Sequence, residues 1–65
     1  MIVQPEGLIG VLLDKTARED ERDDAAMDLG SYPTKEALEA LFKVAIDTTE
    51  NDIILDSCGE SLGEI

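Results

Sequence analysis

The chain has 65 residues, of which 16 are acidic and 5 basic, giving a net charge of −11. This length allows one small domain, and such a negative surface repels both nucleic-acid phosphates and anionic membranes. No apolar run approaches the ~18 residues of a membrane span, and the start of the chain lacks the basic region of a secretory signal.

A first helix is predicted after Pro5, a residue that suits the first turn of a helix. Its apolar residues pair at i, i+4 and form one stripe: Leu8, Ile9, Leu12 and Leu13. The pattern fades at residues 15–16.

A second helix is predicted from the charged segment 18–24, where Asp20 is the candidate cap. Its apolar side carries Ala25, Ala26, Leu29 and Tyr32. Pro33 ends it, because the residue before a proline is biased away from helix. Gly30 is expected to relax the backbone toward this exit.

A third helix is predicted after Thr34, its expected N-cap. Its broad apolar face consists of Leu38, Leu41, Phe42, Ala45 and Ile46. Because this helix should pack on both sides, we expect Leu41 and Phe42 at the centre of the core.

A fourth helix is predicted after the polar run 47–52, where Thr49 and Asp52 resemble a capping box. Its apolar residues are Ile54, Leu55, Cys58, Leu62 and Ile65.

Part of the chain repeats itself at a distance of 33 residues, with segment 22–32 matching segment 55–65. Such a period is typical of stacked helical units. The predicted fold is therefore all-α, a short α-α superhelix of about four helices in antiparallel pairs, forming a single domain over 1–65. The alternative is a fragment of a longer solenoid, because the chain stops at Ile65, where a turn and another helix are expected.

The repeated segments resemble HEAT-like repeats of the phycobilisome-lyase type, whose pattern includes an Arg, an Ala-Ala pair and a Leu-Gly pair. The matching residues are Arg22, Ala25, Ala26, Leu29, Gly30 and Tyr32, then more loosely Ile54, Cys58, Gly59, Leu62, Gly63 and Ile65. Segment 35–42 looks like the family's second helix. Glu21 and Leu55 depart from the usual Val and Arg, so the resemblance does not predict the family's Arg and Asp contacts between these repeats. It implies an interaction scaffold and no specific chemistry.

The sequence contains no histidine, which excludes Ser-His and Cys-His pairs and removes the commonest metal ligand. Cys58, the only cysteine, is expected to be a buried, inert thiol, and it cannot form an internal disulfide, which favours a reducing cytoplasm. Ser57 and Ser61 are expected to be exposed or bonded to nearby backbone. The spacing of Gly59 and Gly63 predicts close helix packing. We expect no catalytic residue, cofactor or metal.

The densest group of carboxylates lies at the start of the second helix, and we call it the acidic edge: Glu19, Asp20, Glu21, Asp23 and Asp24. Its spacing does not match an EF-hand calcium loop. Solvated charge at a helix start explains it, and the functional alternative is a docking edge for a basic protein partner.

Two functional hypotheses follow. The first is a non-catalytic, cytoplasmic protein-interaction module, in a sharper form an immunity-type inhibitor of a basic toxin or enzyme, with no nucleic-acid or membrane partner. The second is an accessory or lyase-like subunit whose chemistry lies in another chain. Self-association would compensate for a small core, and a charge that serves only solubility explains the composition equally well.

Overall fold

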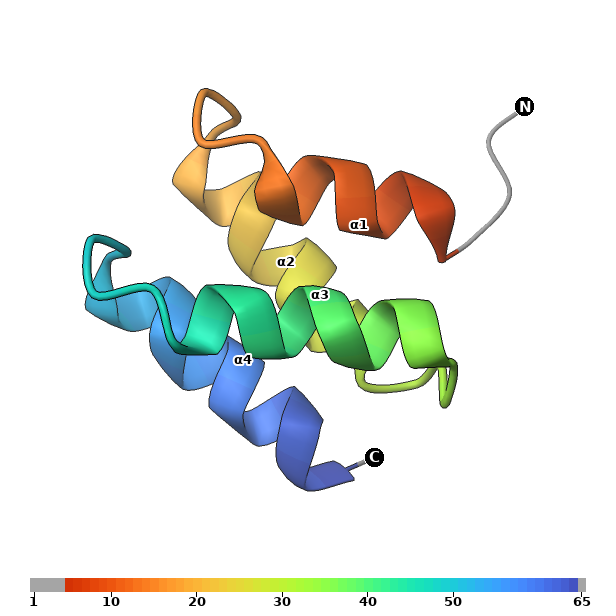
Figure 1. Cartoon of the computed structure of the whole chain (residues 1–65). Coiled ribbons are helices and arrows are strands. Elements are labelled where there is room, and N and C mark those ends of the chain that lie inside the picture. Colours follow the sequence, from red (N-terminus) through yellow and green to blue (C-terminus); the bar gives the residue numbers. More distant parts are fainter. Residues whose placement is uncertain (1–4, 65) are drawn as a thin grey trace.

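The computed structural model describes residues 5–64 and contains four α-helices. They are α1 (Glu6–Leu13), α2 (Glu19–Leu29), α3 (Lys35–Ala45) and α4 (Asp52–Glu64), as Figure 1 shows. Residues 5–64 include no strand, so the predicted all-α fold of about four helices is confirmed. Within the same range, no helix combines the length and the apolar character that crossing a membrane requires.

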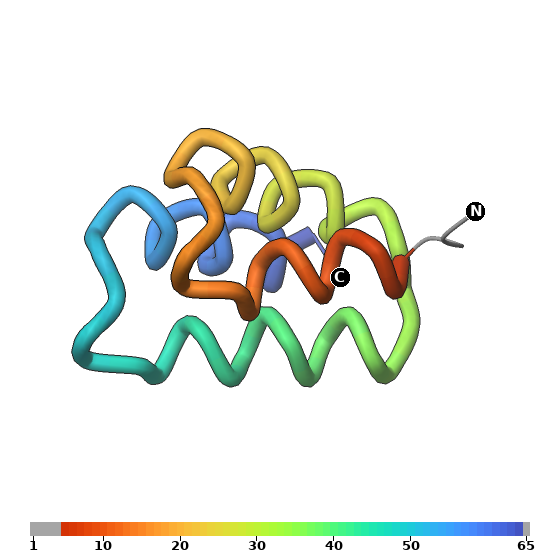
Figure 2. The backbone as a smooth tube through the Cα atoms, turned by 90° about the horizontal axis from the view of Figure 1, so that it is seen from above, coloured from red at the N-terminus to blue at the C-terminus, as the bar shows by residue number. Residues whose placement is uncertain are grey.

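The helices form two stacked hairpins, α1 with α2 and α3 with α4. The hairpins meet mainly through α2 and α4, which pack closely, whereas α1 and α3 touch only sparsely. In Figure 1, α1 and α3 lie toward the viewer, with α2 and α4 behind them. Figure 2 shows that the two loops within the hairpins lie at the same end of the stack, and the loop joining α2 to α3 lies at the opposite end.

The 33-residue period of the sequence recurs in the structure. Helix α2 begins at Glu19 and α4 at Asp52, 33 positions later. The preceding loops repeat as well, because Asp14 accepts hydrogen bonds from the backbone N–H (2.9 Å) and hydroxyl (2.6 Å) of Thr16. Asp47 accepts the same two bonds from Thr49, at 2.9 and 2.6 Å. Equivalent loops therefore lead into α2 and α4.

The core lies between the two hairpins. Its buried residues are Leu12, Ala25, Ala26, Leu29, Ala37, Leu41, Val44, Ile54 and Cys58. Tyr32 is half-buried against them, and Ile65, a predicted apolar position, lies outside the described residues.

Gly30, directly after α2, lies close to Ser61 of α4. A Cβ atom at this position would lie 3.0 Å from the hydroxyl oxygen of Ser61 and 3.2 Å from its Cα. The φ angle of Gly30 is −61°, an ordinary helical value. The expectation that this glycine relaxes the backbone was therefore wrong, because it is the missing side chain that the packing uses.

The expected burial of Phe42 was also wrong. Leu41 is fully buried, but Phe42 is 57% exposed. Leu38 and Ile46, which follow the same i, i+4 row, are exposed too. The reason is that α3 packs closely against α4 alone, so one edge of its wide apolar stripe has no neighbouring helix.

The helix starts agree with the sequence in part. Thr34 caps α3 as predicted, accepting a hydrogen bond from the Ala37 N–H at 3.1 Å. Asp20 lies inside the first turn of α2 and does not precede it. Helix α4 is capped by Asn51, whose side-chain oxygen accepts from the Ile54 N–H at 3.0 Å. The predicted capping box of Thr49 and Asp52 was therefore wrong, because Asn51, which lies between them, provides the cap.

Small residues of α4 pack differently from the prediction. Gly59 and Gly63 are exposed, and a Cβ atom on either would meet nothing within 4 Å. The buried small residues are instead Ser57 and Ser61. The Ser61 hydroxyl donates to the Ala26 carbonyl of α2 at 2.6 Å, so serines and not glycines face the neighbouring hairpin.

Candidate functional site

The acidic edge lies on the first two turns of α2, and within it only Asp23 is half-buried. Asp20, Glu21 and Asp24 are exposed. Asp20 forms an ion pair with Arg18 at 2.8 Å, with both side chains exposed, which makes the pair weak. These three residues and the exposed Glu19 form the part of the predicted edge that a partner can reach.

The other two carboxylates of the acidic edge contact the second hairpin. Glu19 accepts a hydrogen bond from the Asn51 side-chain amide at 3.1 Å. Asp23 is half-buried and accepts a hydrogen bond from the Ser57 hydroxyl. Asp23 therefore contributes to packing between α2 and α4, a role that charge density in the sequence does not indicate.

Arg22, the basic residue within the acidic edge, points into the protein. Its side chain is 6% exposed, and its ion-pair partner Glu50 is 4% exposed. The guanidinium donates to the two Glu50 oxygens at 2.8 and 2.5 Å, and twice to the Leu12 carbonyl at 3.0 and 2.9 Å. That carbonyl belongs to the last turn of α1, where helical partners are lacking. Arg22 thus ties the end of α1 to the loop between α3 and α4, a contact between repeats that the resemblance did not predict.

The Arg22–Glu50 pair is electrostatically strong. The hydrogen bonds from Arg22 hold the pKa of the Glu50 carboxyl below its ordinary value, against the opposing effect of burial. The same bonds raise the pKa of the Arg22 guanidinium. Both groups are therefore charged at neutral pH, and the positive charge of the buried Arg22 neutralises Glu50 and no carboxylate at the surface.

Lys15 joins the two equivalent loops at the surface. Its ammonium group donates to the Asp47 carboxylate at 2.6 Å and to the Thr49 hydroxyl at 2.9 Å. These contacts, the Lys15 hydrogen bond first, hold the pKa of Asp47 well below its usual range. Because the pair is at the surface, it adds little stability. It also means that a second of the five basic side chains is already paired with a carboxylate.

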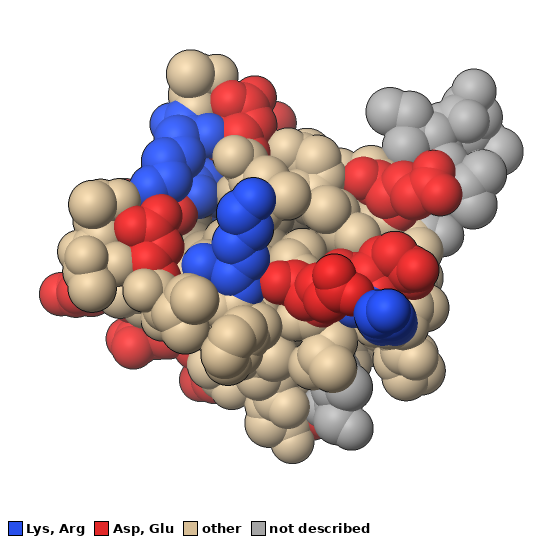
Figure 3. Space-filling view, viewed as in Figure 1, with Lys and Arg blue, Asp and Glu red and all other residues tan. Residues whose placement is uncertain are grey.

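The pairing leaves most of the negative charge unneutralised. Four of the five basic side chains are each paired with one carboxylate, at distances of 2.5 to 3.9 Å. Twelve of the sixteen acidic side chains consequently have no side-chain ion pair, all of them within residues 5–64. On the face in Figure 3, acidic side chains gather over the N-terminal halves of α1 and α3.

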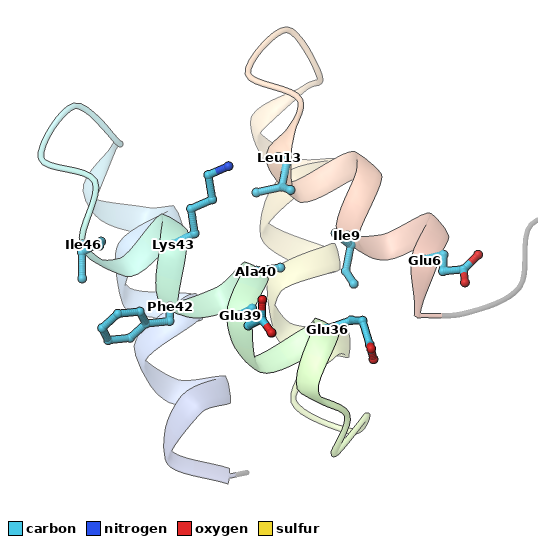
Figure 4. Close-up of a pocket in the computed structure, with 9 residues that line it drawn as sticks. All are labelled: Glu6, Ile9, Leu13, Glu36, Glu39, Ala40, Phe42, Lys43 and Ile46. Carbon is cyan, nitrogen blue, oxygen red and sulfur yellow. The ribbon is translucent and has the colours of Figure 1, made fainter.

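A groove of about 650 Å³ opens between α1 and α3, where these helices touch sparsely. Its lining is mainly apolar and consists of Glu6, Ile9, Leu13, Glu36, Glu39, Ala40, Phe42, Lys43 and Ile46. Figure 4 shows Glu6 and Glu36 toward one end, Phe42 and Ile46 toward the other, and Glu39 between them beside Ala40. The groove was not predicted, because its apolar residues on α1 and α3 were expected to lie in the core.

The chemistry available elsewhere is limited. Cys58 is fully buried, as predicted, and burial raises the pKa of its thiol to about 11, so the nucleophilic thiolate is scarce at neutral pH. Within residues 5–64, no three histidine, cysteine or acidic side chains are placed to hold a metal ion.

Comparisons with protein-family models, with curated proteins and with solved structures found no match. The resemblance to HEAT-like repeats therefore stays a prediction from the residues quoted above.

Proposed function

We propose that the protein is a non-catalytic interaction module that binds a basic protein partner in the cytoplasm. The observation that supports this most is the unneutralised charge, twelve carboxylates without a side-chain ion pair. A fold does not need so many unpaired charges, since like charges repel and destabilise the compact state.

The placement of the charges also favours a basic partner. Asp20, Glu21 and Asp24 are exposed on α2. The nearby Arg22 is buried and cannot offset them outside, and the exposed Arg18 pairs with Asp20 alone. A negative surface of this kind accelerates encounter with a positive one, and it discriminates against acidic partners.

An immunity-type inhibitor is the specific form of this proposal. Such a protein must reach a basic toxin or enzyme quickly and mask its surface, and electrostatic steering serves that purpose. Self-association is the weaker alternative, because two copies would each bring a net charge of −11 to the interface.

Charge reversal at the acidic edge tests the proposal. Partners would be recovered from the native host by affinity capture and identified by mass spectrometry. Association rates with the purified partner would then be measured at low and high salt. Replacing Asp20, Glu21 and Asp24 with Lys should slow association about tenfold or more at low salt. Asp23 is left unchanged, since it bonds Ser57.

The matched control reverses three exposed carboxylates of α4, namely Asp56, Glu60 and Glu64. It changes the net charge equally, and lysines near a helix C-terminus are favourable. The proposal predicts a smaller effect in this control. Association rates that ignore salt and both triple variants would show that the acidity serves only solubility.

A further inference from the structure

We propose that the groove between α1 and α3 receives a short amphipathic segment of the partner, with its apolar residues at the Phe42–Ile46 end and a Lys or Arg at the Glu36–Glu39 end. The inference rests on the proposed function, since it specifies which part of a basic partner is bound.

The apolar end of the groove consists of side chains that folding leaves uncovered. Phe42 is 57% and Ile46 62% exposed, and both lie on α3. Leu13 of α1, which also lines the groove, is exposed as well. Large apolar side chains grouped at a surface mark an interaction site more often than a single exposed one does. The aromatic ring of Phe42 is the natural anchor, because aromatic residues contribute strongly to protein interfaces.

The other end of the groove is built to receive a cation. Glu6 on α1 and Glu36 on α3 line opposite walls, and Glu39 lies beside Glu36 (Figure 4). Glu6 and Glu36 have no side-chain ion pair. Glu39 has only a contact of 3.9 Å with the exposed Lys35. A Lys or Arg of the partner placed here would meet carboxylates from both helices.

Lys43 favours one orientation of the bound segment over the other. It lies toward the apolar end, near Leu13 in Figure 4, and it has no ion pair within residues 5–64. A cation bound at this end would be repelled, whereas one bound at the glutamate end would be attracted. The segment is therefore expected to bind in one orientation, its basic residue toward the start of α3.

The dimensions suit a short segment. Helix α3 has 11 residues, so the groove runs for roughly 16 Å at the helical rise. That length corresponds to two or three turns of a bound helix, or to about five extended residues. Binding of an amphipathic segment in an apolar groove is a common mode of peptide recognition.

Two other occupants fit less well. A second copy of the chain would bring another net charge of −11 toward the groove glutamates. A neutral apolar molecule would fill the Phe42 end but leave Glu6 and Glu36 without a counter-charge. Charge complementarity therefore favours a basic, partly apolar peptide.

The test selects short random peptides by display on the purified protein, then measures their dissociation constants by fluorescence anisotropy. Each of four variants changes one exposed residue. Phe42→Gln and Glu36→Lys alter the groove. Ile53→Gln and Glu60→Lys are matched controls on α4, outside the groove lining. Circular dichroism would check that all four fold.

The expected peptides contain apolar residues followed or preceded by Lys or Arg. Their affinity should fall at least about tenfold in both groove variants, as for an interface residue of central importance. It should stay within about twofold in the Ile53→Gln and Glu60→Lys controls, since exposed residues away from the contact contribute little.

The remaining outcomes overturn the inference in distinguishable ways. Polybasic peptides without apolar residues, bound equally by the groove variants and weakened by reversal of Asp20, Glu21 and Asp24, would overturn the groove site and support the proposed function. Purely apolar peptides or a neutral dye such as Nile red, bound in the groove regardless of Glu36→Lys, would overturn the predicted basic residue and count against a basic partner. Failure to select any peptide that binds the groove would overturn the inference directly.

Discussion

Replacing Arg22 with Met removes the guanidinium that joins α1, α2 and the loop between α3 and α4. The wild-type side chain donates to Glu50 and to the Leu12 carbonyl, and both carboxylate and guanidinium are almost fully buried. Methionine fills a similar volume but donates no hydrogen bond. The variant therefore leaves a buried carboxylate and a buried carbonyl without their partner.

The expected cost follows from these two losses. Breaking a buried ion pair by removing one partner destabilises a protein by ~3–5 kcal/mol. An unsatisfied buried carbonyl costs ~1–3 kcal/mol when water cannot reach it. A domain of this size has a free energy of unfolding near the low end of the usual range, about 5 kcal/mol. Arg22→Met should therefore be largely unfolded at neutral pH.

The double variant Arg22→Met with Glu50→Leu separates the two losses. It removes the stranded carboxylate as well, and replacing both members of a buried pair by apolar residues is often neutral or stabilising. The Leu12 carbonyl still lacks its donor. The double variant should consequently fold, with a free energy of unfolding ~1–3 kcal/mol below that of the wild type.

Urea unfolding followed by circular dichroism at neutral and acidic pH checks these values, with a stabilising osmolyte added if the single variant needs it. In the wild type, the pKa of Glu50 is lowered, so its contribution is complete above its ordinary value of 4.5 and is lost as the pH falls through the folded-state pKa. In Arg22→Met, burial without a partner raises the pKa of Glu50, so protonation at acidic pH removes the cost of burying an unpaired carboxylate. The difference in free energy of unfolding between wild type and variant should therefore be smaller at acidic than at neutral pH. A single variant within about 1 kcal/mol of the wild type, or a gap that does not change with pH, would refute the assigned role of this pair.

Two further predictions concern packing, and thermal unfolding checks both. Leu41→Ala should lower the free energy of unfolding by ~2–5 kcal/mol because Leu41 is fully buried. Phe42→Ala should lower it by less than about 1 kcal/mol because most of the ring is exposed. Equal losses in the two variants would contradict the described core. Gly30→Ala should destabilise by ~1–3 kcal/mol, since its Cβ would lie 3.0 Å from the Ser61 hydroxyl oxygen. Gly59→Ala, with open space around the new Cβ, should stabilise the helix by up to ~1 kcal/mol, and a gain in both variants would mean that α2 and α4 are not closely packed.

Periodicity in the sequence was sufficient to predict the number and type of helices. The apolar stripes at helical spacing predicted all four helices, and the hydrogen bond from the Ala37 N–H to the Thr34 hydroxyl confirms the predicted N-cap of α3. Periodicity does not predict how much of each apolar stripe a neighbouring helix covers. The edge of the α3 stripe that carries Phe42 is free because α1 approaches α3 only sparsely. That spacing depends on the three-dimensional packing of both hairpins.

The roles of charged residues were predicted less well than the helices. The sequence places Arg22 among carboxylates, where solvent exposure is the natural expectation. In the structure it reaches Glu50, 28 positions away in the chain. Asp23 likewise bonds Ser57, 34 positions away. Such pairings depend on which faces of α2 meet the second hairpin, and local charge density carries no information about them.

The helices pack closely on one side of the stack, where Gly30 approaches Ser61 and α2 meets α4, and sparsely on the other, where α1 meets α3. Packed helices move as rigid bodies, so a small displacement between α2 and α4 is passed on to α1 and α3. A bulkier side chain at position 30 would push the hairpins apart there and tilt α1 relative to α3. Substitution at position 30 is therefore expected to change the width of the groove, although Gly30 is not among the residues that line it.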